Sequence, residues 1–206
     1  MSTFTAPPTP TYAEATPRVK AAKVITDALA PGHLVIALLL LIGWHSTGSL
    51  VGVGWGLFAA FFCGIIPLAI IRLGVRRGKL TDKHIRVRRQ RIAPLAATLG
   101  SVVTGIVLLD VLNAPREVFA LVIAMLVGLA SSLAVTVWWQ ISVHNAVAGG
   151  TVMILLLAYG QVLLPAVALV VAIGWSRRVL KAHTVAQLVC GTALGSVAAL
   201  VFALLR

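Results

Sequence analysis

The chain has 206 residues, of which 60% are hydrophobic and only 11% are charged, and its mean hydropathy is +1.03. Soluble domains carry about 25% charged residues, so a water-soluble fold is excluded because it could not bury this much apolar surface. The formal net charge is +12, but the basic residues lie between apolar runs without interleaved aromatic residues, which argues against nucleic-acid binding.

The first segment, residues 1–30, contains four prolines and no long apolar run. This composition is typical of a disordered tail, here leading into a short amphipathic approach to the membrane. The segment does not have the pattern of a cleaved signal peptide. We therefore predict two parts, this N-terminal tail and a transmembrane helical domain over residues 31–206.

Apolar runs separated by polar residues, glycine or proline follow one another through the rest of the chain. Several approach or exceed the ~18 residues that indicate a membrane-spanning helix. The predicted spans are 32–47, 50–72, 93–112, 118–138, 145–160, 162–176 and 184–205. They predict an all-α membrane protein, a bundle of six or seven transmembrane helices.

The number of spans depends on residues 145–176, where Tyr159, Gly160, Gln161 and Pro165 interrupt the apolar run. One helix of this length would measure about 48 Å at roughly 1.5 Å per residue, well beyond a ~30 Å hydrocarbon core. Two short helices are therefore favoured over one kinked helix.

Two glycine pairs, Gly52 with Gly56 and Gly191 with Gly195, lie within predicted spans. Residues four apart share one face of a helix, and glycine lets two helix backbones approach closely. We therefore expect close helix contacts at both pairs. This spacing is common in membrane helices and does not indicate a function.

With seven spans, the links 73–92, 139–144 and 176–183 fall on one side of the membrane, and the first and third are strongly basic. The opposite loops carry only Arg116 and the terminal Arg206. The positive-inside rule then makes the shared side, and the N-terminus, cytoplasmic in a multi-pass protein of the cell membrane. Attraction to anionic headgroups alone also accounts for such basic clusters.

Other polar residues converge on the same three links. Three of the five histidines, His84, His144 and His183, lie there with the majority of the arginines. Ionisable side chains in or beside spans are costly to keep in a membrane, so they mark a candidate functional site. Asp82 is the only acidic residue expected near this face.

Histidines and arginines without a set of carboxylates suit phosphoryl-transfer chemistry. An arginine fork binds phosphate oxygens through two hydrogen bonds and offsets the charge of the transition state. One imidazole can attack phosphorus while another protonates the leaving oxygen. This scheme requires no metal ion or cofactor, and the cysteines and histidines are not spaced as zinc ligands.

The three links resemble the signature motifs of the type 2 phosphatidic acid phosphatase superfamily of membrane lipid phosphatases. Those motifs are K-x-x-x-x-x-x-R-P, P-S-G-H and S-R-x-x-x-x-x-H-x-x-x-D. Ser176, Arg177 and His183 stand at the spacing of the third motif, whose aspartate is replaced here by Gln187. The resemblance covers roughly residues 72–200.

The other two motifs match less closely. In the second, Ser142 and His144 match, but the motif's proline and glycine are replaced. In the first, Arg91 matches but is not followed by proline, and His84 stands where the family has lysine, one residue after Lys83. These departures leave the source of the remaining cation open between His84 and Lys83.

The resemblance implies a phosphohistidine mechanism in which His183 is the nucleophile and His144 the general acid. The phosphate-binding residues that it implies are Arg91, Arg177, Ser142, and His84 or Lys83. Gln187 would orient His183 through its amide oxygen, without the negative charge that an aspartate offers to a developing imidazolium. Turnover would then be slowed or lost, unless Asp82 compensates.

A site at the membrane face favours a substrate whose phosphate lies at the level of the headgroups. We therefore expect a lipid phosphate or diphosphate, such as phosphatidate, phosphatidylglycerol phosphate or a polyprenyl (di)phosphate, among the membrane lipids. One alternative is an inactive homologue that binds lipid phosphates or acts as a scaffold. Another is a small transporter or a cytochrome, although haem would need two histidines facing each other inside the bundle.

Overall fold

A computed structural model of the chain describes residues 15–85 and 87–206. Within these residues the protein is built of helices and contains no strand, which confirms the predicted all-α class. The α-helices are α1 (Pro17–Ala28), α2 (Pro31–Thr47), α3 (Leu50–Ala60), α4 (Ile66–Arg76), α5 (Ile92–Val111), α6 (Arg116–Trp138), α7 (Val143–Tyr159), α8 (Val167–Val179) and α9 (Val185–Leu205). A π-helical turn (Phe61–Ile65) joins α3 to α4, and 3₁₀ turns precede α5 (Arg88–Arg91) and α8 (Gln161–Ala166).

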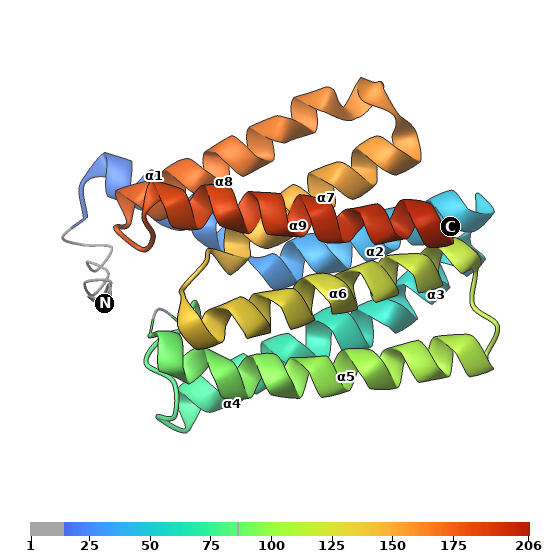
Figure 1. Cartoon of the computed structure of the whole chain (residues 1–206), viewed down its shortest axis with the longest axis horizontal. Helices are drawn as coiled ribbons and strands as arrows, with labels where there is room; N and C mark the ends of the chain where they lie inside the picture. The colour runs from blue at the N-terminus through green and yellow to red at the C-terminus, as the bar shows by residue number, and fades with distance from the viewer. Residues whose placement is uncertain (1–14, 86) are drawn as a thin grey trace.

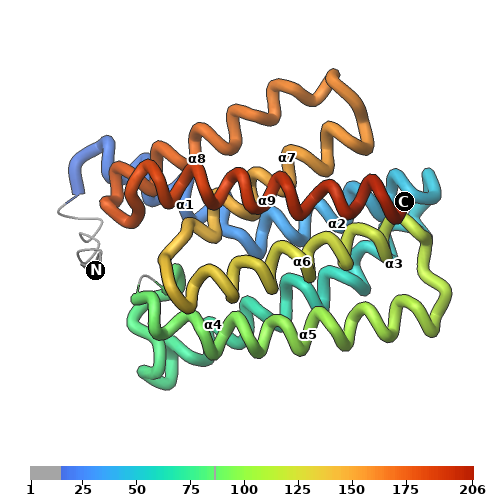
Figure 2. The backbone as a smooth tube through the Cα atoms, in the orientation of Figure 1, coloured from blue at the N-terminus to red at the C-terminus, as the bar shows by residue number. Residues whose placement is uncertain are grey.

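The long helices lie side by side as a bundle (Figures 1 and 2). Among the described residues, five segments are long and apolar enough to cross a membrane, namely Leu50–Arg76, Arg88–Val111, Arg116–Trp138, Gln161–Val179 and Val185–Leu205. Helices α1 and α2 together would form a sixth span with a bend of 46°, and α7 is an apolar helix of 17 residues. The chain is therefore a membrane protein.

Successive passes through the bundle run in opposite directions (Figure 1). The described residues of the first link, 77–85 and 87, and the links 139–142 and 180–184 consequently lie at one end of the bundle, beside α1. The turns at 48–49 and 112–115 lie at the other end with the C-terminus. The predicted convergence of the three links at one end is confirmed.

The interrupted run 145–176 forms two helices, as predicted. Helix α7 ends at Gly160, whose positive φ of 78° is readily adopted only by a residue without a side chain. A 3₁₀ turn that contains Pro165 then leads into α8. The chain therefore reverses direction here, and α7 and α8 pack as neighbours (Figure 2).

Both predicted glycine pairs lie at close helix contacts. A Cβ atom at Gly191 would lie 2.6 Å from the carbonyl oxygen of Ser142, and one at Gly195 would overlap the carbonyl of Ala146. The other predicted pair, on α3, packs in the same way against the backbone of α2. Glycine thus lets α9 lie directly against the first two turns of α7, which fixes how these helices meet at the end that holds the links.

The described part of the N-terminal segment is helical. Helix α1 begins at Pro17, a favoured first helical residue, and the Thr16 hydroxyl accepts a hydrogen bond from the Val19 amide. Near its other end, the hydroxyls of Thr26 and Ser176 lie 3.0 Å apart and join α1 to α8. The sequence predicts a disordered and amphipathic tail over residues 1–30. Pro17–Ala28 within it is an ordered helix, and residues 1–14 lie outside the described residues.

Candidate functional site

A cavity of about 230 Å³ lies at the end of the bundle that holds the three links. Its walls come from the α1–α2 junction, α4, the link 77–87 and the first turns of α5 and α7. Its titratable lining residues are Asp27, His33, Arg72, Lys83, His84, Arg91 and His144. Four predicted site residues, Lys83, His84, Arg91 and His144, therefore line one cavity, although they come from links up to 61 positions apart.

His144 lies in the first turn of α7 and is only 5% exposed. Its ring meets the His84 ring edge-on, with the ring centroids 5.1 Å apart. Its Nε2 atom is buried and forms no hydrogen bond with any described residue. Leaving a buried polar atom unsatisfied costs about 1–3 kcal/mol, so this nitrogen is suited to a hydrogen bond with a ligand.

Ser142 is the N-cap of α7. Its hydroxyl accepts a hydrogen bond from the Asn145 amide at 3.3 Å, and its own amide donates to the carbonyl of Gln187 at 3.1 Å. The serine therefore positions His144, two residues later, and joins α7 to α9. The role of Ser142 as a phosphate ligand stays a prediction. A phosphate bound to its hydroxyl would compete with the hydrogen bond from the Asn145 amide.

Arg91 joins the first link to the second. The residue is 4% exposed, and its guanidinium donates from Nε to the Ile85 carbonyl at 2.7 Å and from Nη1 to the Ile141 carbonyl at 3.0 Å. Ile85 has a φ of 43°, a strained conformation for a β-branched residue. The arginine thus holds a strained loop against α7 and presents its charge at the cavity wall.

The third link places His183 and Gln187 in direct contact. The Nδ1 atom of His183 lies 3.1 Å from Oε1 of Gln187, and the Thr184 amide donates to the same oxygen at 3.1 Å. Because a backbone amide can only donate, the Gln187 atom must be the oxygen, and Nδ1 of His183 must carry a proton. The other ring nitrogen, Nε2, then holds the lone pair that a nucleophile requires.

This contact belongs to the local structure at the start of α9. The Thr184 hydroxyl accepts from the Gln187 amide, and the Gln187 side chain accepts from the Thr184 amide, which together form a capping box. Gln187 therefore has two roles, as a cap of α9 and as the partner of the His183 ring.

Electrostatic interactions bring the third link together with the other two. Arg177, which is 2% exposed at the end of α8, acts on both His84 and His144. The His183 ring and the Arg91 guanidinium also act on His144. Arg177 and His183 therefore lie close enough to His144 for their charges to act on it, but neither residue is among those that line the cavity.

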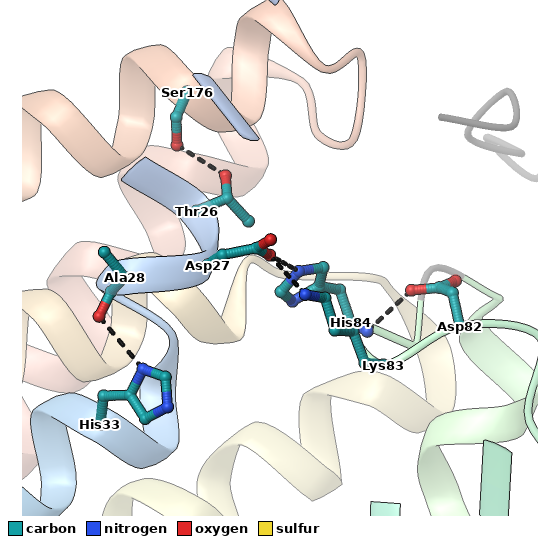
Figure 3. Close-up of polar contacts among 8 residues, drawn as sticks. All are labelled: Thr26, Asp27, Ala28, His33, Asp82, Lys83, His84 and Ser176. Carbon is teal, nitrogen blue, oxygen red and sulfur yellow. Dashed lines mark hydrogen bonds and ion pairs between the residues drawn. The ribbon is translucent and has the colours of Figure 1, made fainter. Parts of the chain in front are cut away.

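A second carboxylate, Asp27 on α1, lines the cavity, so the expectation that Asp82 is the only acid near this face is wrong. The Oδ1 atom of Asp27 lies 2.9 Å from Nζ of Lys83 and 2.8 Å from Nε2 of His84 (Figure 3). Asp82 instead accepts a hydrogen bond from the His84 amide at 2.7 Å. Sequence reasoning missed Asp27 because α1 folds back over the first link, which the sequence does not show. The feature that could have indicated it is a single acidic residue within a basic segment.

The sequence leaves the remaining cation open between His84 and Lys83, and burial acts on the first of these. Burial lowers the pKa of His84, its hydrogen bond with Asp27 opposes this shift, and the charge of Arg177 lowers it further. Nε2 of His84 donates its proton to the Asp27 carboxylate, which can only accept. The other cationic side chains that line the cavity are Arg91, Arg72 and Lys83, the last paired with Asp27.

The described residues hold no group of three or more His, Cys, Asp or Glu side chains placed to bind a metal ion. No family model, curated protein or solved structure matches the chain. The resemblance to the lipid phosphatases therefore rests on the residues of the three links alone.

Proposed function

We propose that the protein is a membrane phosphatase that hydrolyses a lipid phosphate or diphosphate through a phosphohistidine intermediate, without a metal ion. The observation that carries this proposal is the Nε2 atom of His144, which is buried and has no hydrogen bond among the described residues. His144 and Arg91 both line the cavity. Arg177 and His183 act on the same ring. An anion with acidic protons and several acceptor oxygens, such as a phosphate, suits this set of groups.

The chemistry takes place in two steps. In the first, Nε2 of His183 attacks phosphorus, the bond from phosphorus to the leaving oxygen breaks, and His144 gives that oxygen its proton. In the second, His144 takes a proton from water, whose oxygen attacks phosphorus and displaces His183, which releases phosphate. Arg91 and Arg177 offset the negative charge on the phosphoryl oxygens in both steps.

The position of the cavity supports a lipid substrate. It lies at an end of the membrane bundle, where headgroups lie, rather than in a soluble domain. The basic links at this end favour the cytoplasmic side by the positive-inside rule. A lipid phosphate made inside the cell would then reach the site directly.

Phosphate release tests the proposal. Protein purified in detergent is incubated with phosphatidate, phosphatidylglycerol phosphate and polyprenyl phosphates and diphosphates, in the presence of EDTA. We expect release of inorganic phosphate from at least one of these lipids, at a rate that EDTA does not change. Release that requires added divalent metal, or no release from any lipid by folded protein, would contradict the proposal.

A second candidate function, lipid-phosphate binding without turnover, is favoured by one observation. The residue that contacts Nδ1 of His183 is an amide, so it cannot offer a negative charge to an imidazolium. If the protein is an enzyme, Gln187→Asp is expected to raise its rate of phosphate release by about tenfold or more, a usual effect of a residue that orients a reacting group. Gln187→Asn is the matched control because it has the shape of aspartate without its charge.

The comparison of these variants separates the two functions. An Asp variant faster than the Asn variant supports catalysis with a suboptimal orienting group. Equal and negligible rates in folded protein, together with retained binding of a lipid phosphate, would favour the binding function instead.

A further inference from the structure

A second cavity, of about 210 Å³, lies inside the bundle between α2, α4, α5, α6, α7 and α9. It adjoins the polar cavity at the end of the bundle, because both have the same six residues in their walls. The shared residues are Pro31, Gly32, Leu68, Ile71, Leu95 and Val143. The polar cavity and the inner cavity are therefore direct neighbours.

The inner cavity has the chemistry of a site for hydrocarbon. Among the described residues, no charged side chain lines it, and most of its wall is aliphatic. Apolar cavities of comparable size, about 150 Å³, stay free of water and take up hydrophobic molecules. Inside a membrane, the hydrophobic molecules at hand are lipid tails.

The length of the inner cavity matches that of one lipid leaflet. On α7 its lining begins at Val143, beside His144, and continues to Ile154, which corresponds to about 16 Å at roughly 1.5 Å per residue. On α6 it runs over the same number of residues, from Ser132 to Leu121. This depth is about half of a ~30 Å hydrocarbon core.

We infer that the inner cavity binds the single hydrocarbon tail of a lipid whose phosphate lies in the polar cavity, beside His144 and Arg91. This inference rests on the proposed function and narrows the substrate class to single-tailed lipid phosphates and diphosphates. A lipid with two tails would leave its second tail outside, because a cavity of about 210 Å³ has room for one tail only. The far wall, near Leu121 and Ile154, sets the length of tail that fits.

Photo-crosslinking tests this inference without depending on turnover. The probe is dodecylphosphonate, whose carbon–phosphorus bond is not hydrolysed, with a diazirine either at the end of the tail or beside the phosphonate. We expect the terminal diazirine to label α6 and α7 near Leu121 and Ile154, and the other to label residues near Leu95 and Val143. Labelling confined to surface residues such as Val107 and Val197, or no labelling, would overturn the inference.

A variant that fills the cavity provides a second measurement. A Cβ atom at Gly128 would meet only the Cβ of Ala198, at 3.5 Å, and Gly128 lines the cavity, so the side chain of Gly128→Leu is expected to take up cavity space. It is expected to lower labelling by the terminal probe about tenfold, which corresponds to ~1.4 kcal/mol. The control is Gly100→Leu, at an exposed position on α5 with no neighbour within 4 Å, which should leave labelling unchanged.

Failure of this inference is distinguishable from failure of the proposed function. Phosphate release without labelling of the inner cavity would overturn the tail site and leave the phosphatase standing. Labelling of the inner cavity by a protein that releases no phosphate would support the tail site in a lipid-phosphate binder.

Discussion

Replacing His183 with alanine is expected to abolish phosphate release and to leave the helical bundle folded. His183 is 1% exposed. Its Nδ1 atom donates a hydrogen bond to Gln187, so the lone pair of the ring is on Nε2, the atom proposed as the nucleophile. Loss of a catalytic nucleophile lowers kcat by about 10⁴-fold or more, because no neighbouring group replaces it. The measurement is release of phosphate in the presence of EDTA, with gel filtration and thermal unfolding to establish that the variant is folded.

The matched control is His45→Ala, at the other end of the bundle. Nδ1 of His45 lies 2.7 Å from Glu117, and both side chains are partly exposed, so their interaction contributes only about 0–1 kcal/mol. This variant should release phosphate at the wild-type rate. If His183→Ala also does so, His183 is not the nucleophile and the phosphohistidine mechanism fails.

Gly195→Val is expected to have the largest effect on stability. The added side chain would overlap the Ala146 carbonyl, so α7 and α9 would have to separate. Overpacking of this kind costs about 3 kcal/mol or more, because a helix backbone cannot move aside as a side chain does. We expect a lower unfolding temperature in detergent and a smaller fraction of monodisperse protein.

Gly100→Val is the control for this substitution. A Cβ atom at Gly100 meets no neighbour within 4 Å, and the residue is exposed on α5. Its effect should stay within about 0.5 kcal/mol, as for most surface substitutions. Equal unfolding temperatures for the two variants would mean that α7 and α9 do not pack as closely as described.

Much of the fold is predictable because helices in a membrane follow local patterns. The predicted span 93–112 corresponds to α5 (Ile92–Val111), since a helix that satisfies its own backbone continues for as long as the apolar run does. The contact between His183 and Gln187 also follows from spacing, because residues four apart meet on a helix face. These features depend on neighbours in the sequence.

The remaining parts of the site depend on contacts between distant segments. Asp27 and His84 are 57 residues apart, and their contact follows from the direction in which α1 turns away from α2. The lowered pKa of His84 follows from burial that only the assembled bundle produces. The inner cavity is likewise a space left between several helices, which no pattern along one helix predicts.

The two hydrogen bonds of Arg91 have a consequence for the biosynthesis of the protein. One acceptor, Ile85, lies six residues before the arginine, but the other, Ile141, lies fifty residues after it. A chain that inserts from its N-terminus makes Arg91 long before its second acceptor exists, and meanwhile the guanidinium has to stay hydrated at the membrane surface. The same charge thus keeps the first link out of the bilayer early on and later ties it to α7, so this end of the bundle is completed only after α6 and the start of α7 have been synthesised.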